Sequence, residues 1–369
     1  MTESLSKTDV ARLLADPTTD TRAEIAVKVA RQIDATSLTA QERAIAEDIV
    51  RALSHDAAIR VRQALAEQLK QSRRLPHDVA LSLANDVEVV SLPILTHSVV
   101  LTDEDLVEII RCSGVAKQSA IASRETISES VAAAIVERDQ VAAVATLVAN
   151  DGAELEESML QQVLDRYGDL AAINEPMAAR AELPITVIER LVVAASDNLR
   201  GILAKRSDLP SHLVSDLVLN TRERATVSLL SPASPRAEAL KLVQHLQRSG
   251  RLTPSLIVRA LCLGDLPFVE ASFAVLAGVP VHNARLLIYD SGQLGFKALY
   301  ERCHLPAQLF ELFRVAMRVA RDTDFDGGEN DRERHRRRTL ERILTQYDEL
   351  SADDLDYLLD KLSAGAAAA

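Results

Sequence analysis

The fold is decided by a short stretch that recurs along the chain, one copy of which is Leu101-Thr102-Asp103-Glu104-Asp105-Leu106. Each copy begins with an aliphatic residue, followed by Pro, Ser, Thr or Glu, two variable residues and an amphipathic apolar run. The copies begin at Leu75, Leu101, Ile127, Leu155, Leu183, Leu209, Leu252, Val279 and Leu305. Their separations are 26, 26, 28, 28, 26, 43, 27 and 26 residues, a regularity that indicates an internal repeat.

The recurring stretch has the chemistry of a helix start. Proline suits the first helical turn because its missing N–H would be unpaired there, and Ser or Thr caps the same turn. A weaker copy at Leu38 adds a capping box, in which Thr39 is followed three residues later by Glu42. The leading aliphatic residue can pack on the first buried turn as a hydrophobic staple. Each copy therefore predicts the start of an amphipathic helix.

A second helical segment lies between successive starts. Examples are residues 86–95, 115–123, 141–149 and 199–205. These segments are short and apolar nearly all round, as expected of helices packed between neighbours. Helices of this length are marginal alone in water, so each pair must be covered by the next. The sequence therefore predicts an all-α fold, an α-α superhelix of two-helix repeats with 26–28 residues per repeat.

The repeat suggests four segments. Residues 1–70 read as N-terminal helices with an opening repeat, and 71–230 as an acidic helical-repeat array. Residues 231–310 read as a second helical-repeat array after an inserted helix; this segment begins with the breaker Ser231-Pro232-Ala233-Ser234-Pro235 and the one extra helix, 237–247. This interruption is either a seam between two arrays or an insertion in one. Residues 311–369 read as C-terminal helices with an acidic loop and a basic helix start.

The charge is concentrated in one part of the chain. The formal net charge is −12, and residues 75–220 carry 23 Asp and Glu against 10 Lys and Arg. Such a surface repels phosphate backbones, so we expect no nucleic-acid binding along it. An acidic groove favours a basic helix or tail of a protein partner, with a salt-sensitive association rate.

Targeting signals and cysteine usage bear on the compartment. No run approaches the roughly 18 apolar residues of a membrane helix, and the first residues lack a secretory pattern. The three cysteines, Cys112, Cys262 and Cys303, are isolated, which suits a reducing compartment. We therefore expect a cytoplasmic protein without a membrane span.

A basic residue recurs three positions before several helix starts. The residues are Arg124, Arg180, Arg206 and Arg302. One interpretation is a favourable cation at a helix C-terminus, and the other is a column of arginines that binds an acidic partner group. The sequence leaves both interpretations open, so these arginines are candidates for partner binding.

The acidic loop at 322–333 fits the calcium-loop pattern. Asp322, Asp324 and Asp326 occupy positions 1, 3 and 5, Gly327 occupies position 6 and Glu333 occupies position 12. These four acids are the candidate ligands for Ca²⁺. Against them stand Glu329 at the usually apolar position 8, nearby arginines and the lack of a second such loop. The alternative is a solvated acidic linker.

The basic helix start that follows the loop is a further candidate for partner binding, through Arg334, Arg336, Arg337 and Arg338. It lacks the interleaved aromatic residues that stack on bases, so a nucleic-acid role is disfavoured. The eight histidines are scattered, and no HExxH, GxSxG or phosphate-loop motif occurs. We therefore predict no catalytic residues and no cofactor other than Ca²⁺.

The chain resembles an uncharacterised proteobacterial family of helical-repeat proteins known only as a domain of unknown function. More distantly it is similar to HEAT and leucine-rich-repeat-variant arrays. The resemblance rests on the Leu-Pro helix starts and on residues 83–87, 92–95, 101–106 and 120–124, and it covers most of 40–320. HEAT-like arrays mostly act as protein-binding scaffolds, while a few have become lyases or base-excision enzymes.

We therefore expect a non-enzymatic scaffold or adaptor that binds another protein, in a bacterial regulatory pathway. One alternative is a helical-repeat enzyme acting on nucleic acid or a small ligand, which requires a cleft with convergent carboxylates and basic rims. The other is a calcium-responsive regulator that uses residues 322–333. The identity of the partner and the oligomeric state cannot be read from the sequence.

Overall fold

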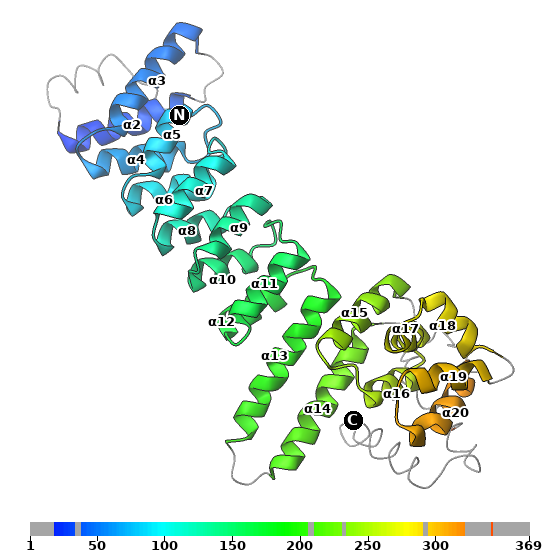
Figure 1. Cartoon of the computed structure of the whole chain (residues 1–369). Helices are drawn as coiled ribbons and strands as arrows, with labels where there is room; N and C mark the ends of the chain where they lie inside the picture. The colour runs from blue at the N-terminus through cyan, green and yellow to red at the C-terminus, as the bar shows by residue number, and fades with distance from the viewer. Residues whose placement is uncertain are drawn as a thin grey trace. The chain divides into compact units, whose positions relative to one another are not determined.

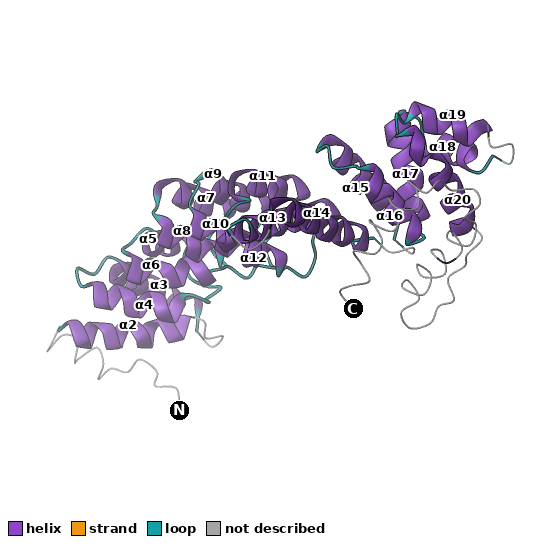
Figure 2. Cartoon of the chain, turned by 90° about the horizontal axis from the view of Figure 1, so that it is seen from below, coloured by secondary structure: helices purple, strands orange, loops and turns teal. Residues whose placement is uncertain are grey.

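A computed structural model describes residues 18–33, 38–205, 210–230, 234–290 and 294–321, together with Glu341. Every regular element among these residues is helical: nineteen α-helices, α2 to α20, and one 3-10 turn, η1 (Figure 1 and Figure 2). One isolated bridge joins Ile127 and Ala153, and no strand forms in the described ranges. The all-α prediction is confirmed.

The chain divides into two compact units, Met1–Glu182 and Leu183–Ala369. The division lies inside the segment 71–230 that the sequence treats as one array.

The first unit contains α2 to α12. Their bounds are α2 Thr19–Ile33, α3 Ala40–Ser54, α4 Ile59–Leu69, α5 His77–Ala84, α6 Glu88–His97, α7 Asp103–Cys112, α8 Val115–Ala122, α9 Glu129–Glu137, α10 Val141–Ala149, α11 Glu157–Tyr167 and α12 Ala171–Ala178. The inner helices α2, α4, α6, α8, α10 and α12 contact one another in that order. The outer helices contact across pairs at α3–α5 and at α7–α9 (Figure 1).

The predicted helix starts coincide with observed ones. Helices α5, α7, α9, α11, α13, α14, α16 and α18 and the turn η1 each begin one or two residues after the leading aliphatic residue. Thr39 and Thr102 form capping boxes with Glu42 and Asp105, so two orphan N–H groups are satisfied at each of these starts. Among the leading residues, Leu75, Leu101 and Ile127 are buried, whereas Leu183 is half-buried.

The predicted separate helix at 199–205 is wrong. Helix α13 runs unbroken over Ile185–Leu203, and α14 is similarly long. Other pairs break where Asp139 adopts a left-handed backbone (φ 59°) or where Gly168 ends α11. The corresponding residues of α13, 194–198, contain neither Gly nor Pro, and Ser196 Oγ donates to Val192 O within the helix at 2.7 Å. With nothing to end the helix there, it continues.

The second unit contains α13 to α20. Their bounds are α13 Ile185–Leu203, α14 Ser211–Ser228, α15 Arg236–Arg248, α16 Pro254–Cys262, α17 Leu266–Ala277, α18 Val281–Ile288, α19 Leu294–Arg302, η1 Ala307–Leu309 and α20 Phe310–Arg321. Helix α15 is the extra helix predicted at 237–247. Phe273 of α17 lies edge-on to Phe296 and Phe313, with ring centroids 5.5 and 5.6 Å apart. This unit thus has an aromatic core, centred on the buried helix α17.

No single helix of the described chain is long and apolar enough to cross a membrane. Helices α17 and α18 pass that test together by length and composition, but they are bent by 108° at the break between them.

The loop between α10 and α11 approaches the loop before α9 very closely. The N–H of Ile127 donates to Gly152 O at 3.1 Å, and the N–H of Glu154 donates to Ile127 O at 2.9 Å. A Cβ atom on Gly152 would overlap the carbonyl oxygen of Glu125. Glycine is therefore required here for close backbone approach, which joins two successive helix pairs.

We predict that Gly152→Ala lowers the free energy of unfolding by about 1–3 kcal/mol, because the neighbouring backbone must shift. Gly114→Ala is the matched control, since a Cβ at Gly114 meets nothing within 4 Å. This control should change stability by less than about 1 kcal/mol. Urea unfolding followed by circular dichroism measures both, and equal effects of the two variants would contradict the close approach.

Candidate partner-binding surface

Three inner helices of the first unit, α6, α8 and α10, end in carbonyl groups that accept hydrogen bonds from the next helix pair. Arg124, which follows α8, donates from Nη1 to Leu95 O and from Nη2 to Ser98 O, both at 2.7 Å. Those two oxygens lie at the C-terminal end of α6, where helical carbonyls lack a partner within the helix. Burial lowers the pKa of the Arg124 guanidinium, and the nearby Asp103 carboxylate opposes this shift. Arg124 therefore ties one helix pair to the pair before it.

The same connection recurs further along the unit. Asn150 Nδ2 donates to Ala122 O at 2.9 Å and to Arg124 O at 2.7 Å, beyond the end of α8. Arg180 Nη1 donates to Asn150 O at 2.7 Å, beyond the end of α10. We call Arg124, Asn150 and Arg180 the carbonyl ladder. The cations in it also oppose the partial negative charge of the helix ends.

The arginines predicted from the sequence thus have intramolecular partners. In the second unit, Arg302 Nε donates to Ala277 O at 2.7 Å, at the end of α17. Binding of a partner by Arg124, Arg180 or Arg302 stays a prediction. The remaining candidates, Arg206, Arg334, Arg336, Arg337 and Arg338, lie outside the described residues.

Sequence reasoning missed Asn150, because it stands five residues before the next start, Leu155, rather than three. The signal that could have found it is its place at the end of an inner segment, where Arg124 and Arg180 also stand.

We predict that Asn150→Ala lowers the free energy of unfolding by about 1–3 kcal/mol, because it leaves two carbonyl groups without a donor. The control is Asn85→Ala, which removes a bond to Leu81 O within the same helix pair. This control should cost about 1 kcal/mol or less. Chemical unfolding of both variants tests the ladder, and a harmless Asn150→Ala would show that it does not join the pairs.

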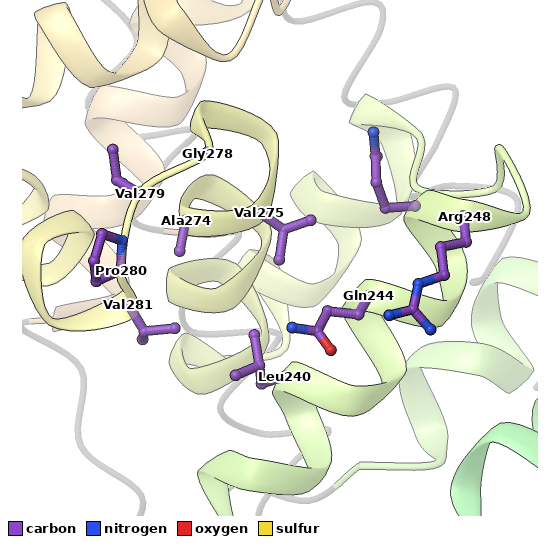
Figure 3. A pocket seen from close by; sticks show the side chains of 10 residues that line it. Leu240, Gln244, Arg248, Ala274, Val275, Gly278, Val279, Pro280 and Val281 are labelled. Carbon is purple, nitrogen blue, oxygen red and sulfur yellow. The ribbon is translucent and has the colours of Figure 1, made fainter.

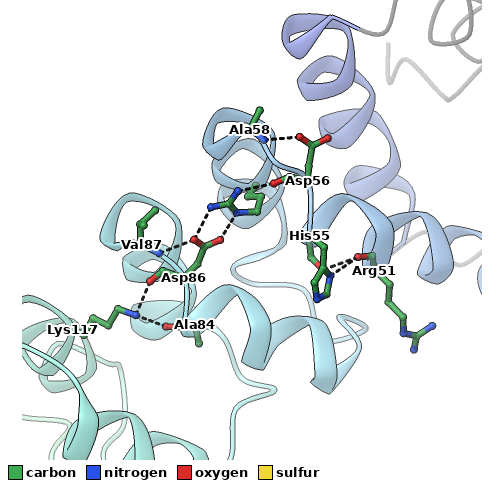
Figure 4. Close-up of polar contacts among 10 residues, drawn as sticks. Arg51, His55, Asp56, Ala58, Ala84, Asp86, Val87 and Lys117 are labelled. Atoms are coloured by element: carbon green, nitrogen blue, oxygen red, sulfur yellow. Dashed lines mark hydrogen bonds and ion pairs between the residues drawn. The ribbon is translucent and has the colours of Figure 1, made fainter.

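The turns from outer to inner helix carry a second set of connections, built on aspartates. Arg22 Nε lies 2.8 Å from Asp56 Oδ2, and Arg62 Nε lies 2.5 Å from Asp86 Oδ2. Lys117 Nζ donates to Asp86 O at 2.7 Å (Figure 4). Sequence reasoning missed this set, although an Asp stands before four of the inner helices, α4, α6, α10 and α12, at residues 56, 86, 139 and 169.

We predict that Asp86→Asn destabilises the chain at pH 7 by about 1.5–3 kcal/mol, since the hydrogen bond from Arg62 involves two charged groups. That hydrogen bond lowers the pKa of Asp86 below its unfolded value of about 3.9. The stabilisation is therefore present above about pH 4 and is lost as the pH falls through the folded pKa. The difference between variant and wild type should shrink on acidification.

Asp169→Asn is the matched control for this experiment. Asp169 holds the corresponding turn position but is exposed, and it has no ion-pair partner among the described residues. Its replacement should change stability by no more than about 0.5 kcal/mol at any pH. Similar costs for both variants would argue against a role for the Arg62 contact.

Residues 75–182 are rich in acidic side chains, and seven of these lie on the first turns of the outer helices. Residues 75–182 hold 19 Asp and Glu against 6 Lys and Arg. Lys117, Arg124, Arg166 and Arg180 are four of the six bases, and each donates to main-chain carbonyls. The cations in this part of the chain therefore serve mainly helix ends, and most carboxylates remain on the surface.

We call the acids on the first turns of α5, α7, α9 and α11 the acidic edge: Asp78, Asp103, Glu104, Asp105, Glu129, Glu156 and Glu157. The first turns of α5 and α7 are adjacent, because His77 Nε2 lies 2.7 Å from Asp105 Oδ2. The first turns of α7 and α9 are also adjacent, because Ser130 Oγ lies 3.5 Å from Asp103 Oδ2. Glu104, Glu129 and Glu156 are exposed.

The second unit contains a buried ionic network instead. Glu189 of α13 is 1% exposed and lies 3.1 Å from His245 Nε2 and 2.9 Å from Arg251 Nη2. Glu223 of α14 accepts hydrogen bonds from Thr253 Oγ1 at 2.8 Å and Ser255 Oγ at 2.5 Å. The cavity beside these carboxylates has a volume of about 10 Å³, which is room for about one water molecule. The network therefore joins α13, α14, α15 and α16 rather than facing a substrate-sized cleft.

A larger groove of about 440 Å³ lies between α15 and the turn from α17 to α18. Figure 3 shows Leu240, Val275 and Val281 lining it, with Gln244 and Arg248 on the side of α15. The apolar lining suits an aliphatic side chain, but the groove carries no group that would define its ligand.

Metal ligands and cysteines give no further site. No three His, Cys, Asp or Glu side chains of the described ranges converge as a metal site. The calcium candidates Asp322, Asp324, Asp326 and Glu333 lie outside those ranges. Cys262 and Cys303 are buried free thiols, and burial raises the pKa of Cys303 to about 12. A thiol with that pKa stays protonated near neutral pH.

A family model described as an uncharacterised protein conserved in bacteria (DUF2336) matches residues 90–351. This match covers more than half of the chain. The chain belongs to the DUF2336 family. No curated protein and no solved structure matches it. The predicted resemblance to an uncharacterised bacterial family is therefore confirmed at that level.

The residues that match DUF2336 include the carbonyl ladder and the buried ionic network of the second unit. The matched residues begin inside α6, so the ion pair of Arg62 with Asp86 lies before the matched region. The DUF2336 description states no activity, so an argument about function depends on the geometry and charge of the chain itself.

Proposed function

We propose that this DUF2336 protein is a non-enzymatic scaffold or adaptor in the bacterial cytoplasm, which binds a basic segment of another protein along the acidic edge. The observation that carries the proposal is that residues 75–182 contain 19 acidic residues and 6 basic residues. Complementary charge speeds encounter with such a segment and selects against acidic competitors.

The arrangement of helices favours the same role. We interpret the serial contacts of inner helices as an α-α superhelix of 26–28-residue repeats, similar to HEAT arrays. Repeat arrays of this kind offer extended surfaces to protein partners. Neighbouring packed helices are about 8–10 Å apart, close to the Debye length of about 8 Å at physiological salt. Carboxylates on adjacent outer helices therefore act together on one bound segment.

A helical-repeat enzyme acting on nucleic acid or a small ligand is the alternative that the buried carboxylates Glu189 and Glu223 favour. The cavity beside these two carboxylates has room for about one water molecule, which favours a structural role for both residues. A calcium-responsive regulator through residues 322–333 is a separate hypothesis. Calorimetric titration of the full chain with Ca²⁺, repeated on Asp322→Ala, tests it, and the absence of heat at millimolar Ca²⁺ would reject it.

The scaffold proposal is tested by affinity capture from a bacterial lysate with the immobilised full chain. The test variant combines Glu104→Gln, Glu129→Gln and Glu156→Gln on the acidic edge. The control variant removes the same charge from the second unit, through Asp216→Asn, Glu238→Gln and Glu301→Gln, at residues that are also exposed. Retained proteins are identified by mass spectrometry at low and high salt.

We expect wild type and control to retain a protein with a Lys- and Arg-rich segment at low salt. High salt and the test variant should both release it, because each weakens the same electrostatic attraction. Equal retention by the test variant, or recovery of DNA alone, would overturn the proposal.

A further inference from the structure

A pocket of about 230 Å³ lies in the first unit, near the ends of α4 and α6. It is lined by Gln71, Arg73, Thr96, His97, Val99, Arg124, Glu125 and Thr126. Six of these eight side chains can donate hydrogen bonds, and Glu125 is the one acid among them. The lining is thus polar and predominantly basic.

The carbonyl ladder has no arginine at the corresponding position beside this pocket. Arg124 and Arg180 stand three residues before a helix start and reach back across one helix pair. The same position before Leu101 is Ser98, whose Oγ accepts a hydrogen bond from the N–H of Val100 at 3.3 Å. Its side chain is too short to reach the end of α4. The pocket lies next to this position, between Gln71 and Arg73 on one side and the neighbours of Ser98, His97 and Val99, on the other.

The positive charge of Arg124 is incompletely balanced. Its guanidinium is bonded to two neutral carbonyl groups, and no carboxylate lies within ion-pair distance of it in the described chain. A helix end supplies only about half of an elementary negative charge. Arg124 is half-buried, and the effect of burial on its pKa exceeds the opposing effect of the nearby Asp103. An anion beside Arg124 would therefore be stabilised.

Two further cationic or potentially cationic groups are free to contact such an anion. Arg73 and His97 are exposed, and neither has a hydrogen-bond or ion-pair partner within the described ranges. The hydroxyl groups of Thr96 and Thr126 have no partner there either. Guanidinium groups bind the oxygens of phosphate in a bidentate manner, and hydroxyl groups can satisfy the remaining lone pairs.

We propose that this pocket binds a phosphate group, held between the guanidinium groups of Arg73 and Arg124 with His97 and the two threonine hydroxyls as further donors. A phosphate group suits this pocket better than a carboxylate does, because the additional oxygens of the phosphate can accept hydrogen bonds from more of the donors in the lining. Residues 18–74, which include α4, hold ten Lys and Arg against eight Asp and Glu. Their net charge is therefore slightly positive and does not repel an anion. The site is distinct from the acidic edge and does not depend on the scaffold proposal.

Isothermal titration calorimetry of the full chain tests the proposal, with two probes. One is inorganic phosphate, and the other is a Gly-Gly-phosphoserine-Gly-Gly peptide alongside its unphosphorylated form. Saturable binding of inorganic phosphate is expected whether the natural ligand is free phosphate or a phosphorylated side chain. Tighter binding of the phosphopeptide would identify a phosphorylated side chain as the source, and exclusion of the peptide would identify free phosphate.

Variants separate this pocket from general electrostatic attraction. Arg73→Gln should weaken phosphate binding about tenfold, as expected for a lost charge-assisted hydrogen bond. Glu125→Gln should strengthen binding severalfold, because it removes the one acid in the lining. Arg111→Gln is the control and should have no effect, since Arg111 is an exposed arginine outside the pocket.

All three substituted side chains are exposed, so folding should be preserved, and circular dichroism checks this. The proposal is overturned by the absence of saturable heat with both probes at tens of millimolar. It is also overturned by binding that Arg73→Gln and Glu125→Gln leave unchanged.

Discussion

The first unit depends on one interaction, in which a side chain of the following helix pair donates hydrogen bonds to the last carbonyl groups of the inner helices α6, α8 and α10. Its inner helices are short, and helices of this length are unstable alone in water. Their terminal carbonyls would be buried without a donor if the pairs separated, at a cost of about 1–3 kcal/mol each. Arg124, Asn150 and Arg180 prevent this loss. Each pair therefore stabilises its predecessor through packing and through hydrogen bonds.

This arrangement also decides how charge is distributed. Four of the six cations in residues 75–182 serve main-chain carbonyls, so they cannot pair with most of the 19 carboxylates in the same residues. Seven of these acids lie on the first turns of the outer helices, where the helix dipole favours negative charge. The same physical preference that stabilises the helices thus produces a surface suited to a basic partner. A polar pocket lies beside Arg124, lined also by His97 and Val99, the neighbours of Ser98.

The second unit uses different means to hold its helices together. Phe273, Phe296 and Phe313 pack edge-on around α17, and the carboxylates of Glu189 and Glu223 are buried with basic and hydroxyl partners. Breaking a buried pair on one side leaves an uncompensated charge, so such a network fixes which helices meet. The residues that match the DUF2336 family model, 90–351, include both the carbonyl ladder of the first unit and the buried ionic network of the second unit.

The sequence by itself determined the helix starts and the all-α class, because a cap such as Thr102 acts on a backbone N–H three residues away. It also determined that residues 75–220 are acidic. The sequence did not predict that α13 continues past Asn198, because the recurring Asp before an inner helix does not by itself end the preceding one. Only the tertiary structure decided the partners of Arg124, Asn150 and Asp86, which bond to residues 24 to 31 positions away. It alone placed the pocket beside Arg124, because a cavity depends on which neighbour fails to fill it.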